Sequence, residues 1–423
     1  MSAGGFHDSF SGHDPIVFDV GTHSIRFGFC DGNSPSTDMP AAVGSMLDGT
    51  ESTSRNDRIK EELPYFVNTN TLCVPREGME LKNIIRQGII EDWDAFEYIM
   101  DYAYSKCLFT EPNLHPVLFT ESPSNLKQKR EKLMELMFEK YNVPGIIICT
   151  NAAAAAFSCS VSTGIIVDSG ASHTSAIPIY QGYVMSDAVV SSPMGGDFIL
   201  KQCEKLFHEN KIDVIPRYLV SNKKPVRPKE APIWSRKNIL PKVTDSWHNY
   251  MCKSVLEDFQ HTVLEVAEIP LNNAVLSNFP TCHYEFPNGY NQEFGGERFK
   301  IPEILFYSNL KNDALFSLNQ IVHLSAGMCN KNIRNELYGN IILTGGNSLI
   351  KGFPRRLHKD ISMELRNTRL KLTAPINSSN RRFGAWIGGS LLATADKFNH
   401  LWFSTSEYYE IGTDQINLNF RYV

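Results

Sequence analysis

The sequence predicts an α/β protein built from two similar lobes. Its 423 residues, 42% of them hydrophobic, are enough for two or three packed units. A hairpin-like pattern occurs twice, at residues 16–28 and 165–178. Strand-like and helix-like segments alternate around both hairpins, which is typical of α/β proteins. Two similar hairpins in such a chain indicate two similar lobes.

The overall charge excludes a protein whose whole surface binds nucleic acid. Lys and Arg total 41 against 46 Asp and Glu, a net charge of -5. The nine cysteines are scattered, with no pair at a metal or redox spacing, so we expect a reducing compartment. We expect neither a secretory signal nor a membrane span, because the charge-free run 141–167 is interrupted by Pro144 and by several polar residues.

The two hairpins share a chemical feature as well as a shape. The first reads IVFDVGTHSIRFG and the second IIVDSGASHTSAIP, so a buried run ends in Asp-x-Gly in both. Glycine allows backbone N–H groups to approach an anion closely, and an Asp at a strand end can hold a hydrated divalent cation. One such hairpin is more often only a tight turn. As a pair, they predict a clamp around a polyphosphate.

The remaining elements follow in chain order. The polar stretch Gly44 to Glu62 predicts a loop. Ser124 is expected to cap a helix that ends before Pro144. A buried strand, GIIIC, then precedes a helix that begins near Ala152 and presents Asn151 to the first hairpin. NIILTGGNSL predicts another buried strand with a Gly-Gly turn, and RRFGAWIGGSLLA a closely packed helix.

One segment, Arg217 to Lys242, is strongly basic. It holds eight positive side chains, one Glu and four prolines, so it is not expected to be helical throughout. It is either a solvated insertion or a contact for an acidic partner or a phosphate backbone. The candidate partner or DNA contacts are Lys223, Lys224, Arg227 and Lys229.

Several blocks of this sequence resemble the actin family along nearly the whole chain. They are FDVGTHSIRFGF, GIIEDWD, HPVLFTESPSNLKQKREKLMELMFE, GIIVDSG, GGERFKIPEILF, LYGNIILTGG and RRFGAWIGGSLLA. The resemblance implies an actin-like ATPase fold, with two RNase H-like lobes around a nucleotide cleft and a smaller inserted subdomain in each. The first lobe would hold residues 1–158 and 384–423, with an insertion at about 45–84. The second would hold residues 159–383, with an insertion at about 195–311.

Three further segments, DSGASHTSAIP, SWHNYMC and HYEFPNGYNQEFG, narrow the resemblance. They are most similar to the nuclear actin-related proteins of the actin-like protein six group. This implies a nuclear scaffold subunit of SWI/SNF-type chromatin remodellers and histone acetyltransferase complexes that contributes to transcription regulation. Its partners would be monomeric actin and a helical segment of a remodeller ATPase or acetyltransferase scaffold subunit, with nucleosome or DNA as a further candidate.

The resemblance also implies ATP and Mg²⁺ in the cleft. Asp19 and Asp168 would hold the cation through water. The positions that match the family's nucleotide contacts are Asp19, Gly21, Thr22, Arg26, Asp168, Gly170, Gly345, Gly346, Asn347 and Arg382. Arg26 replaces a phosphate-directed lysine, which keeps the charge but changes its geometry. Asn249 and Tyr250 stand near the positions that contact ribose and base in actin, so base-side affinity is in doubt.

Other departures bear on hydrolysis and on assembly. Asn151 is one methylene shorter than actin's water-orienting Gln, the second loop lacks two residues, and His173 aligns with the histidine near the attacking water. His23 replaces a glycine, and its ring crowds the loop, supplies a donor or lies at a surface turn. We expect no competent catalytic residue and little or no ATP hydrolysis. The polar stretch 44–62 replaces actin's filament loop, so we expect no self-polymer; the alternative is a polymerising actin-like ATPase of the cytoskeleton.

Overall fold

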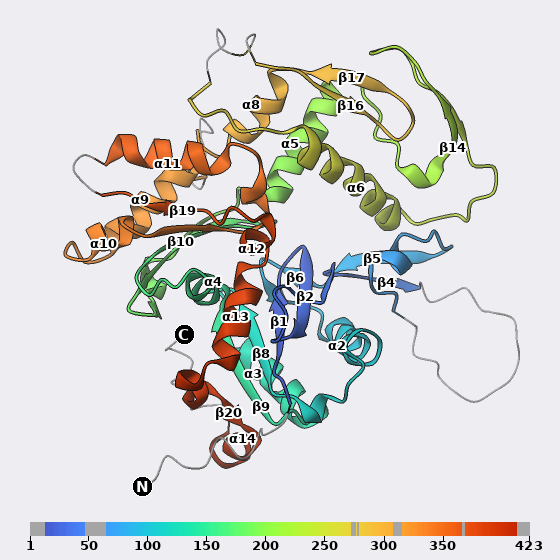
Figure 1. Cartoon of the computed structure of the whole chain (residues 1–423). Helices are drawn as coiled ribbons and strands as arrows, with labels where there is room; N and C mark the ends of the chain where they lie inside the picture. The colour runs from blue at the N-terminus through green and yellow to red at the C-terminus, as the bar shows by residue number, and fades with distance from the viewer. Residues whose placement is uncertain are drawn as a thin grey trace, which may run out of the picture.

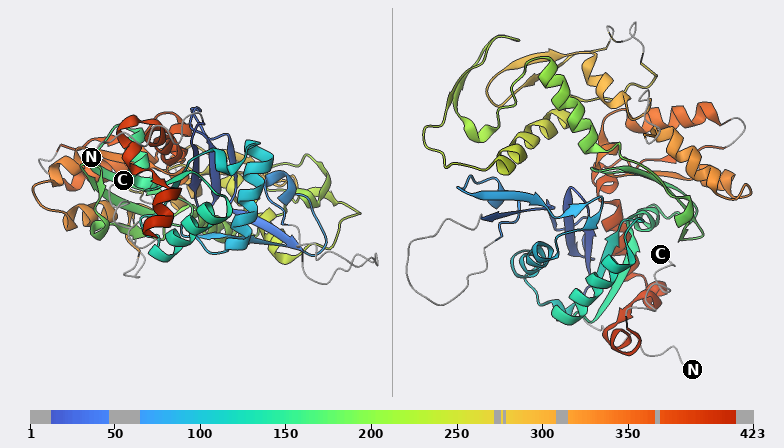
Figure 2. Two further views of the ribbon diagram at one scale, coloured as in Figure 1. Left: turned by 90° about the horizontal axis from the view of Figure 1, so that it is seen from below. Right: turned by 180° about the vertical axis from the view of Figure 1, so that it is seen from behind.

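The computed structural model describes residues 13–46, 65–271, 276, 279–307, 315–365 and 369–412. Figure 1 shows two lobes, each built around its own sheet, with strand β1 (Ile16–Val20) in one and strand β10 (Gly164–Ser169) in the other. Seen from below in Figure 2, the molecule is flatter than in the view of Figure 1. The expected α/β fold with two lobes is confirmed.

The first sheet has six strands, and it contains two adjacent pairs of parallel strands. From edge to edge they are β20 (Phe403–Ser404), β9 (Gly145–Thr150), β8 (Val117–Glu121), β1, β2 (Ser24–Phe29) and β3 (Thr37–Pro40). Strand β1 pairs antiparallel with β2 and parallel with β8, and β8 runs parallel to β9. Ile16, Val17 and Phe18 are fully buried, as expected of a central strand covered on both faces.

The second sheet repeats this arrangement. Its path is β12 (Tyr183–Val184), β11 (Thr174–Tyr180), β10, β18 (Ile341–Thr344) and β19 (Leu372–Thr373), and β13 (Val190–Ser192) also pairs with β11. Strand β10 pairs antiparallel with β11 and parallel with β18, which runs parallel to β19. Both predicted hairpins are therefore present, each at the same place in its sheet.

Strand register decides which side chains meet at the ends of the two hairpins. Asp19 lies opposite Arg26 in the pair β1–β2 and opposite Thr120 in the pair β1–β8. In the second sheet, Asp168 lies opposite Thr344. Directly opposite residues in paired strands are close enough to interact, so the register by itself supplies each carboxylate with polar neighbours.

Helices cover both sheets. Those that contact the strands or the core of the first sheet are α2 (Trp93–Tyr102), α3 (Lys127–Glu135), α4 (Asn151–Ser158), α13 (Gly384–Thr394) and α14 (Thr405–Ile411). Helix α4 also contacts β10 of the second sheet, and α1 (Thr69–Leu72) lies between β4 and β5 in the chain. The remaining helices are α5 (Gly196–Glu209), α6 (Asp245–Val263), α8 (Glu297–Glu303), α9 (Leu318–Met328), α10 (Arg334–Tyr338), α11 (Phe353–Glu364) and α12 (Ser378–Arg382). The exact lobe boundaries stay a prediction.

Helices α4 and α13 make the closest helix contact of the first lobe. A Cβ atom at Gly388 would lie 1.6 Å from the carbonyl oxygen of Ala154. Only glycine allows the two backbones to approach this closely. The closely packed helix predicted from WIGGSLLA is thus confirmed, and it holds α4, with Asn151 at its start, against the sheet.

The expected cap at Ser124 is wrong. Helix α3 begins at Lys127 after the N-cap residue Leu126, and no side-chain cap is made. The Ser124 hydroxyl instead shares a hydrogen bond of 2.8 Å with the Ser122 hydroxyl. This local bond satisfies the serine outside the helix, an alternative that serine side chains often take.

The basic segment and the first residues of the polar stretch lie in smaller sheets. Strands β14 (Val220–Lys224) and β15 (Ile233–Arg236) form an exposed hairpin at the outer edge of the second lobe (Figure 1), so the segment is not helical throughout, as expected. The polar stretch 44–62 starts within β4 (Ala42–Met46), which pairs with β5 (Met79–Asn83), and its residues 47–62 lie outside the described residues. The other two-stranded sheets are β6 (Ile85–Arg86) with β7 (Ile89–Ile90), and β16 (Cys282–Glu285) with β17 (Asn291–Phe294).

All nine cysteines are free. No helix within the described ranges combines the length and the apolar character that crossing a bilayer requires.

Candidate functional site between the two hairpins

A cavity of about 540 Å³ lies between the two lobes, where the ends of both hairpins face each other. This size is within the roughly 300–1,000 Å³ typical of small-molecule sites. Every predicted binding residue lines it, as do both degenerate catalytic positions: Asp19, Gly21, Thr22, Arg26, Asn151, Asp168, Gly170, His173, Gly345, Gly346, Asn347 and Arg382. The four basic candidates of the β14–β15 hairpin are not among the lining residues.

The Asp19 carboxylate has a partner on each oxygen. Arg26 Nη1 donates to Asp19 Oδ2 at 2.7 Å, and Thr120 Oγ1 donates to Asp19 Oδ1 at 2.6 Å. Burial lowers the pKa of Arg26, but Asp19 and Asp38 outweigh it and raise the pKa above its ordinary value. Arg26 is therefore a permanent cation whose charge is directed first at Asp19.

The second carboxylate, Asp168, is held by Asn151. The Asn151 side-chain nitrogen donates to Asp168 Oδ2 at 3.0 Å. Burial raises the pKa of Asp168, while His173, Arg26 and the Asn151 hydrogen bond oppose the rise. Asn151, the residue expected to orient a water molecule, therefore donates its side-chain N–H to the neighbouring carboxylate.

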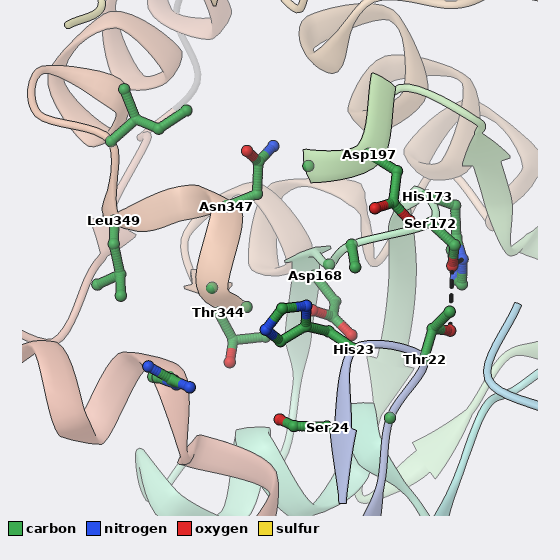
Figure 3. Close-up of a pocket in the computed structure, with 18 of the residues that line it drawn as sticks. Thr22, His23, Ser24, Asp168, Ser172, His173, Asp197, Thr344, Asn347 and Leu349 are labelled. Atoms are coloured by element: carbon green, nitrogen blue, oxygen red, sulfur yellow. Dashed lines mark hydrogen bonds between the residues drawn. The ribbon is translucent and has the colours of Figure 1, made fainter. Parts of the chain in front are cut away.

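A chain of hydroxyl contacts connects the two loops. Thr22 Oγ1 lies 3.3 Å from Ser172 Oγ, which in turn lies 2.8 Å from His173 Nδ1. Figure 3 shows the Thr22 and Ser172 side chains reaching towards each other from opposite hairpins. The backbone N–H of Gly88 also donates to Thr22 Oγ1, at 2.8 Å. The two turns are thus already joined by side chains.

His23 lines the cavity, and its ring points into the space between the hairpins (Figure 3). Its Nδ1 atom is 3.7 Å from Glu257 Oε1 on α6, across the cleft. Burial lowers the pKa of His23 to about 4, and Lys253, Arg26 and Arg382 contribute to the decrease. Of the three roles left open for this histidine, the structure favours a neutral ring that occupies space in the cleft.

The turn after β18 completes the floor of the cavity. Gly345 has φ +90, and a Cβ there would lie 2.3 Å from the Ser169 carbonyl oxygen, so this position needs glycine. The Asn347 side-chain nitrogen donates to Ser169 Oγ at 3.0 Å. Gly346, by contrast, faces open space, with nothing within 4 Å of an added Cβ.

Helix α6 contributes residues that sequence reasoning missed. Glu257, Gln260 and His261 line the cavity from this helix, whereas Asn249 and Tyr250 do not. Burial raises the pKa of Glu257 and lowers that of His261. The i, i+3, i+4 spacing of these residues marks one helix face, but only the placement of α6 shows which face meets the cleft.

The lobes also contact each other at the N-terminal end of α6, through residues that do not line the cavity. Trp247 of α6 is fully buried in a cluster with Met79 of β5 and Met251. Its indole N–H donates to the Leu72 carbonyl oxygen at 2.7 Å, and the backbone N–H of Leu81 donates to Ser246 Oγ at 2.9 Å. The N-terminal end of α6 is therefore fastened to the small β4–β5 sheet opposite it.

Comparison with known proteins identifies the family of this chain. The family model described as actin matches residues 11–421. The chain belongs to the actin family. Members of this family in general bind a nucleotide and a divalent metal ion in the cleft, and the paired hairpins of this actin-family chain lie at that cleft.

Curated relatives cover nearly the full length of this actin-family chain. It is 33% identical over 431 residues to "Actin-related protein 4" of Arabidopsis thaliana, covering 95% of this chain and 97% of the relative. It is 34% identical over 433 residues to the protein of the same name in Oryza sativa subsp. indica, with the same coverage. It is 30% identical over 419 residues to "SWI/SNF and RSC complexes subunit arp42" of Schizosaccharomyces pombe, covering 95% and 96%. The expected actin-like protein six label is not supported, because the Arabidopsis and Oryza relatives carry the name actin-related protein 4.

Buried polar atoms at the cavity fit a phosphate-bearing ligand. Among the described residues, the buried side-chain atoms without a hydrogen-bond partner include Arg26 Nε, Ser24 Oγ and Asn151 Oδ1. All three residues line the cavity, and unsatisfied buried polar atoms are costly unless a ligand or water pairs with them. The two donors suit phosphate oxygens.

A divalent cation at these residues would share Asp19 with Arg26. Mg²⁺ in nucleotide sites is held by one or two carboxylates together with phosphate oxygens and water. Here each Asp19 oxygen already accepts one hydrogen bond, and one of the two donors is the Arg26 guanidinium. In the parts of the chain that the structure describes, no cluster of three or more His, Cys, Asp or Glu side chains is arranged for a metal. The predicted role of Asp19 as a water-mediated Mg²⁺ ligand stays a prediction, and its ion pair with Arg26 would compete with the cation.

Proposed function

We propose that this chain is a nuclear actin-related scaffold subunit of chromatin-remodelling and histone acetyltransferase complexes, and that it binds ATP as a structural ligand. Structural ATP binding is supported by one observation: both hairpins line the same cavity between the lobes. A ligand that contacts both loops stabilises the closed arrangement of the lobes. At a concentration 100 times its dissociation constant, such a ligand adds about 2.7 kcal/mol to stability.

Little or no hydrolysis is proposed because each candidate catalytic side chain is held by a neighbouring residue, which restricts where it can place a water molecule. Asn151 donates to Asp168 at 3.0 Å, and His173 Nδ1 contacts Ser172 Oγ at 2.8 Å. A nucleophilic water must be placed within hydrogen-bond reach of its orienting group, and a displacement of about 1 Å can cost roughly 10²-fold in rate. Bound ATP then stays intact and holds the two lobes together.

The proposed membership of a chromatin-remodelling complex is supported by the relatives. The Schizosaccharomyces pombe relative is named as a subunit of SWI/SNF and RSC complexes. We propose the same class of assembly for this chain, located in the nucleus, contributing to transcription regulation and paired with monomeric actin. A helical segment of the remodeller ATPase or acetyltransferase scaffold subunit would receive both proteins. The exposed basic hairpin, with Lys224, Arg227 and Lys229, is the proposed contact for nucleosomal DNA.

Gentle purification of the full-length chain from nuclei tests the assembly. We expect stoichiometric actin together with remodeller or acetyltransferase subunits, identified by mass spectrometry. Recovery of the chain as a free monomer, with neither class of companion, would contradict the proposal. Thermal unfolding with and without millimolar ATP tests the ligand separately, and an unchanged melting temperature would exclude a structural nucleotide.

A polymerising actin-like ATPase is the alternative. Asp19, Asp168 and His173 all line the cavity, as that alternative requires. Sedimentation of the purified chain with ATP, together with measurement of released phosphate, separates the two functions. Filaments that form with phosphate release would favour the alternative, whereas a soluble monomer without phosphate release favours the scaffold.

A further inference from the structure

We propose that His23 is a phosphate-binding side chain, and that the triphosphate binds in this cleft together with a proton that His23 takes up. This inference rests on the proposed function, because it concerns the ligand of the same cavity. It is supported by the position of the His23 ring, by the donors that its turn leaves unused, and by the charges around it.

The first turn holds His23 at the wall of the cavity. The backbone N–H of Ala41 donates to the His23 carbonyl oxygen at 3.1 Å, and the Asn83 side-chain nitrogen donates to the Thr22 carbonyl oxygen at 2.8 Å. The ring points into the space between the hairpins (Figure 3), and 47% of the side chain is exposed. A ligand at this turn therefore meets the ring without a rearrangement of the backbone.

The protein leaves several donors of this turn unused. In the part of the chain that the structure describes, neither the backbone N–H of Thr22 nor that of His23 donates to a backbone carbonyl. The His23 ring makes no hydrogen bond to these residues either, and its ion-pair partner, Glu257 Oε1, is 3.7 Å from Nδ1. Successive backbone N–H groups in a turn favour an anion. One turn thus offers a ring and two backbone donors to phosphate oxygens.

Three cations act on the ring. Burial is the largest cause of the pKa of about 4 at His23, and these cations lower it further from helix α6, strand β2 and helix α12: Lys253, Arg26 and Arg382. Surroundings that oppose a positive charge on the imidazole favour a negative charge beside it. The ring therefore lies where the cavity attracts an anion.

The carboxylates near the ring do not cancel this effect. Asp197 on α5 opposes the decrease in the pKa of His23, but less than each cation promotes it, and Asp197 is paired with Lys253 at 2.8 Å. Glu257 faces the ring from α6, and burial raises its pKa, which weakens its negative charge in the acidic range. The cavity wall holds further titratable side chains, so the proton has to be assigned by variants: Asp19, Asp168, His173 and His261.

A bound triphosphate reverses the balance of charge at the ring. It brings several negative charges to the turn, and an opposite charge within about 4–6 Å favours the charged form of a titratable group. The imidazolium then donates a charge-assisted hydrogen bond to a phosphate oxygen. At pH 6 the free chain carries almost no proton on His23, whereas a return to the ordinary pKa of 6.5 would protonate about three quarters of the rings.

The test is isothermal titration calorimetry of ATP, in excess Mg²⁺, into the full-length chain freed of nucleotide, at pH 6 in buffers of different ionisation enthalpy. The dependence of the heat on the buffer gives the number of protons taken up per ATP bound. We expect the unmodified chain to take up roughly 0.5–1 proton more than His23→Gln, which keeps a donor of similar size but does not titrate. Protons on the ATP phosphates contribute equally to both proteins.

Two other results would contradict different claims. Equal proton uptake by the unmodified chain and His23→Gln would overturn the inference while leaving the proposed ATP site intact. No binding of ATP to the unmodified chain would instead contradict the proposed function. His23→Asn should behave like His23→Gln, so the test remains available if one variant folds poorly.

The same coupling should appear in the affinity. Between pH 7.5 and pH 5.5, we expect the dissociation constant of the unmodified chain for ATP to fall about tenfold relative to that of His23→Gln, because linked proton uptake strengthens binding as the pH falls. At pH 7.5 the two constants should agree within about threefold. A ratio of the two constants that is independent of pH would contradict proton uptake by His23.

His323→Gln is the matched control. Burial also lowers the pKa of His323, whose Nδ1 atom is 3.0 Å from the Tyr338 hydroxyl, but this histidine lies on α9 and does not line the cavity. We expect this variant to take up as many protons per ATP as the unmodified chain. An equal loss of uptake in both glutamine variants would show that the proton does not belong to His23, and would overturn the inference.

Discussion

The indole N–H of Trp247 donates a hydrogen bond of 2.7 Å to the carbonyl oxygen of Leu72, joining helix α6 of one lobe to helix α1 of the other. Both residues are fully buried. The bond joins the two lobes outside the cavity lining, so moving the lobes apart at this point would break it. Exchange of a bound nucleotide is therefore expected to depend on this pair.

Trp247→Phe should accelerate nucleotide release. Phenylalanine keeps most of the apolar contact with Met79 and Met251 but leaves the Leu72 carbonyl buried without its donor, a cost of about 1–3 kcal/mol. We expect a lower free energy of unfolding and a dissociation rate for a fluorescent ATP analogue that rises about tenfold, measured by stopped-flow displacement.

Trp386→Phe is the matched control for this variant. Trp386 is also fully buried and donates its indole N–H to the Val17 carbonyl oxygen at 3.2 Å, but that bond lies within the first lobe. It should lower stability to a similar extent and leave the release rate unchanged. Equal acceleration in both variants would mean that general destabilisation, and not the contact between the lobes, controls release.

His23→Gln should change how stability depends on pH. The folded-state pKa of His23 is about 4, below the ordinary value of 6.5, so protons bind the unfolded chain more readily. The unmodified chain should lose stability relative to the variant as pH falls from about 6.5 to about 4, with no such loss above that window. The slope should stay below about 1.4 kcal/mol per pH unit, because 47% of the side chain is exposed.

Urea unfolding at intervals of half a pH unit measures this difference. His23→Asn should behave like His23→Gln, since both remove the titrating ring. Parallel stability curves for the unmodified chain and both variants across the window would contradict a neutral histidine with a lowered pKa in the cleft.

Gly388→Ala should destabilise the first lobe strongly. The added Cβ would lie 1.6 Å from the Ala154 carbonyl oxygen, which is backbone and cannot rotate away. We expect a loss of roughly 3 kcal/mol or more, measured by chemical unfolding. Gly327→Ala, in α9, is the control: its Cβ meets nothing within 4 Å, so the better helix propensity of alanine should stabilise the protein by roughly 0.5–1 kcal/mol.

Neutralising the basic hairpin should weaken binding to DNA without unfolding the protein. Lys224, Arg227 and Lys229 are exposed, whereas Lys223 pairs with Glu285 at 2.6 Å and contributes less free charge. The triple alanine variant should bind duplex DNA less tightly, with a smaller dependence of affinity on salt and an unchanged melting temperature.

Three exposed lysines away from the hairpin, Lys205, Lys211 and Lys331, form the control set. Their replacement removes the same charge and should leave most of the affinity intact, as measured by fluorescence anisotropy at several salt concentrations. An equal loss in both triple variants would show that net charge, and not the hairpin, determines DNA binding.

The sequence alone predicted both hairpins and the residues with which they line the cavity. Strand and turn preferences act over a few residues, so the buried run, the Asp and the Gly in each hairpin can be recognised without knowledge of the rest of the chain. The pairing of Asp19 with Arg26 follows from the same short hairpin, although the sequence analysis assigned the two residues separately to a cation and a phosphate. Ser124 shows the limit of local rules, because a neighbouring serine competed for its hydroxyl.

Tertiary structure decided the rest of the site. Glu257, Gln260 and His261 reach the cavity only because α6 packs across the cleft, and Trp247 meets Leu72 from 175 positions further along the chain. Such contacts depend on the relative position of the two lobes. Many weak contacts between residues far apart in the chain determine that position. Local sequence determines which chemical groups each loop carries, but the packing of the lobes determines which of those groups face one another and which remain free for a ligand.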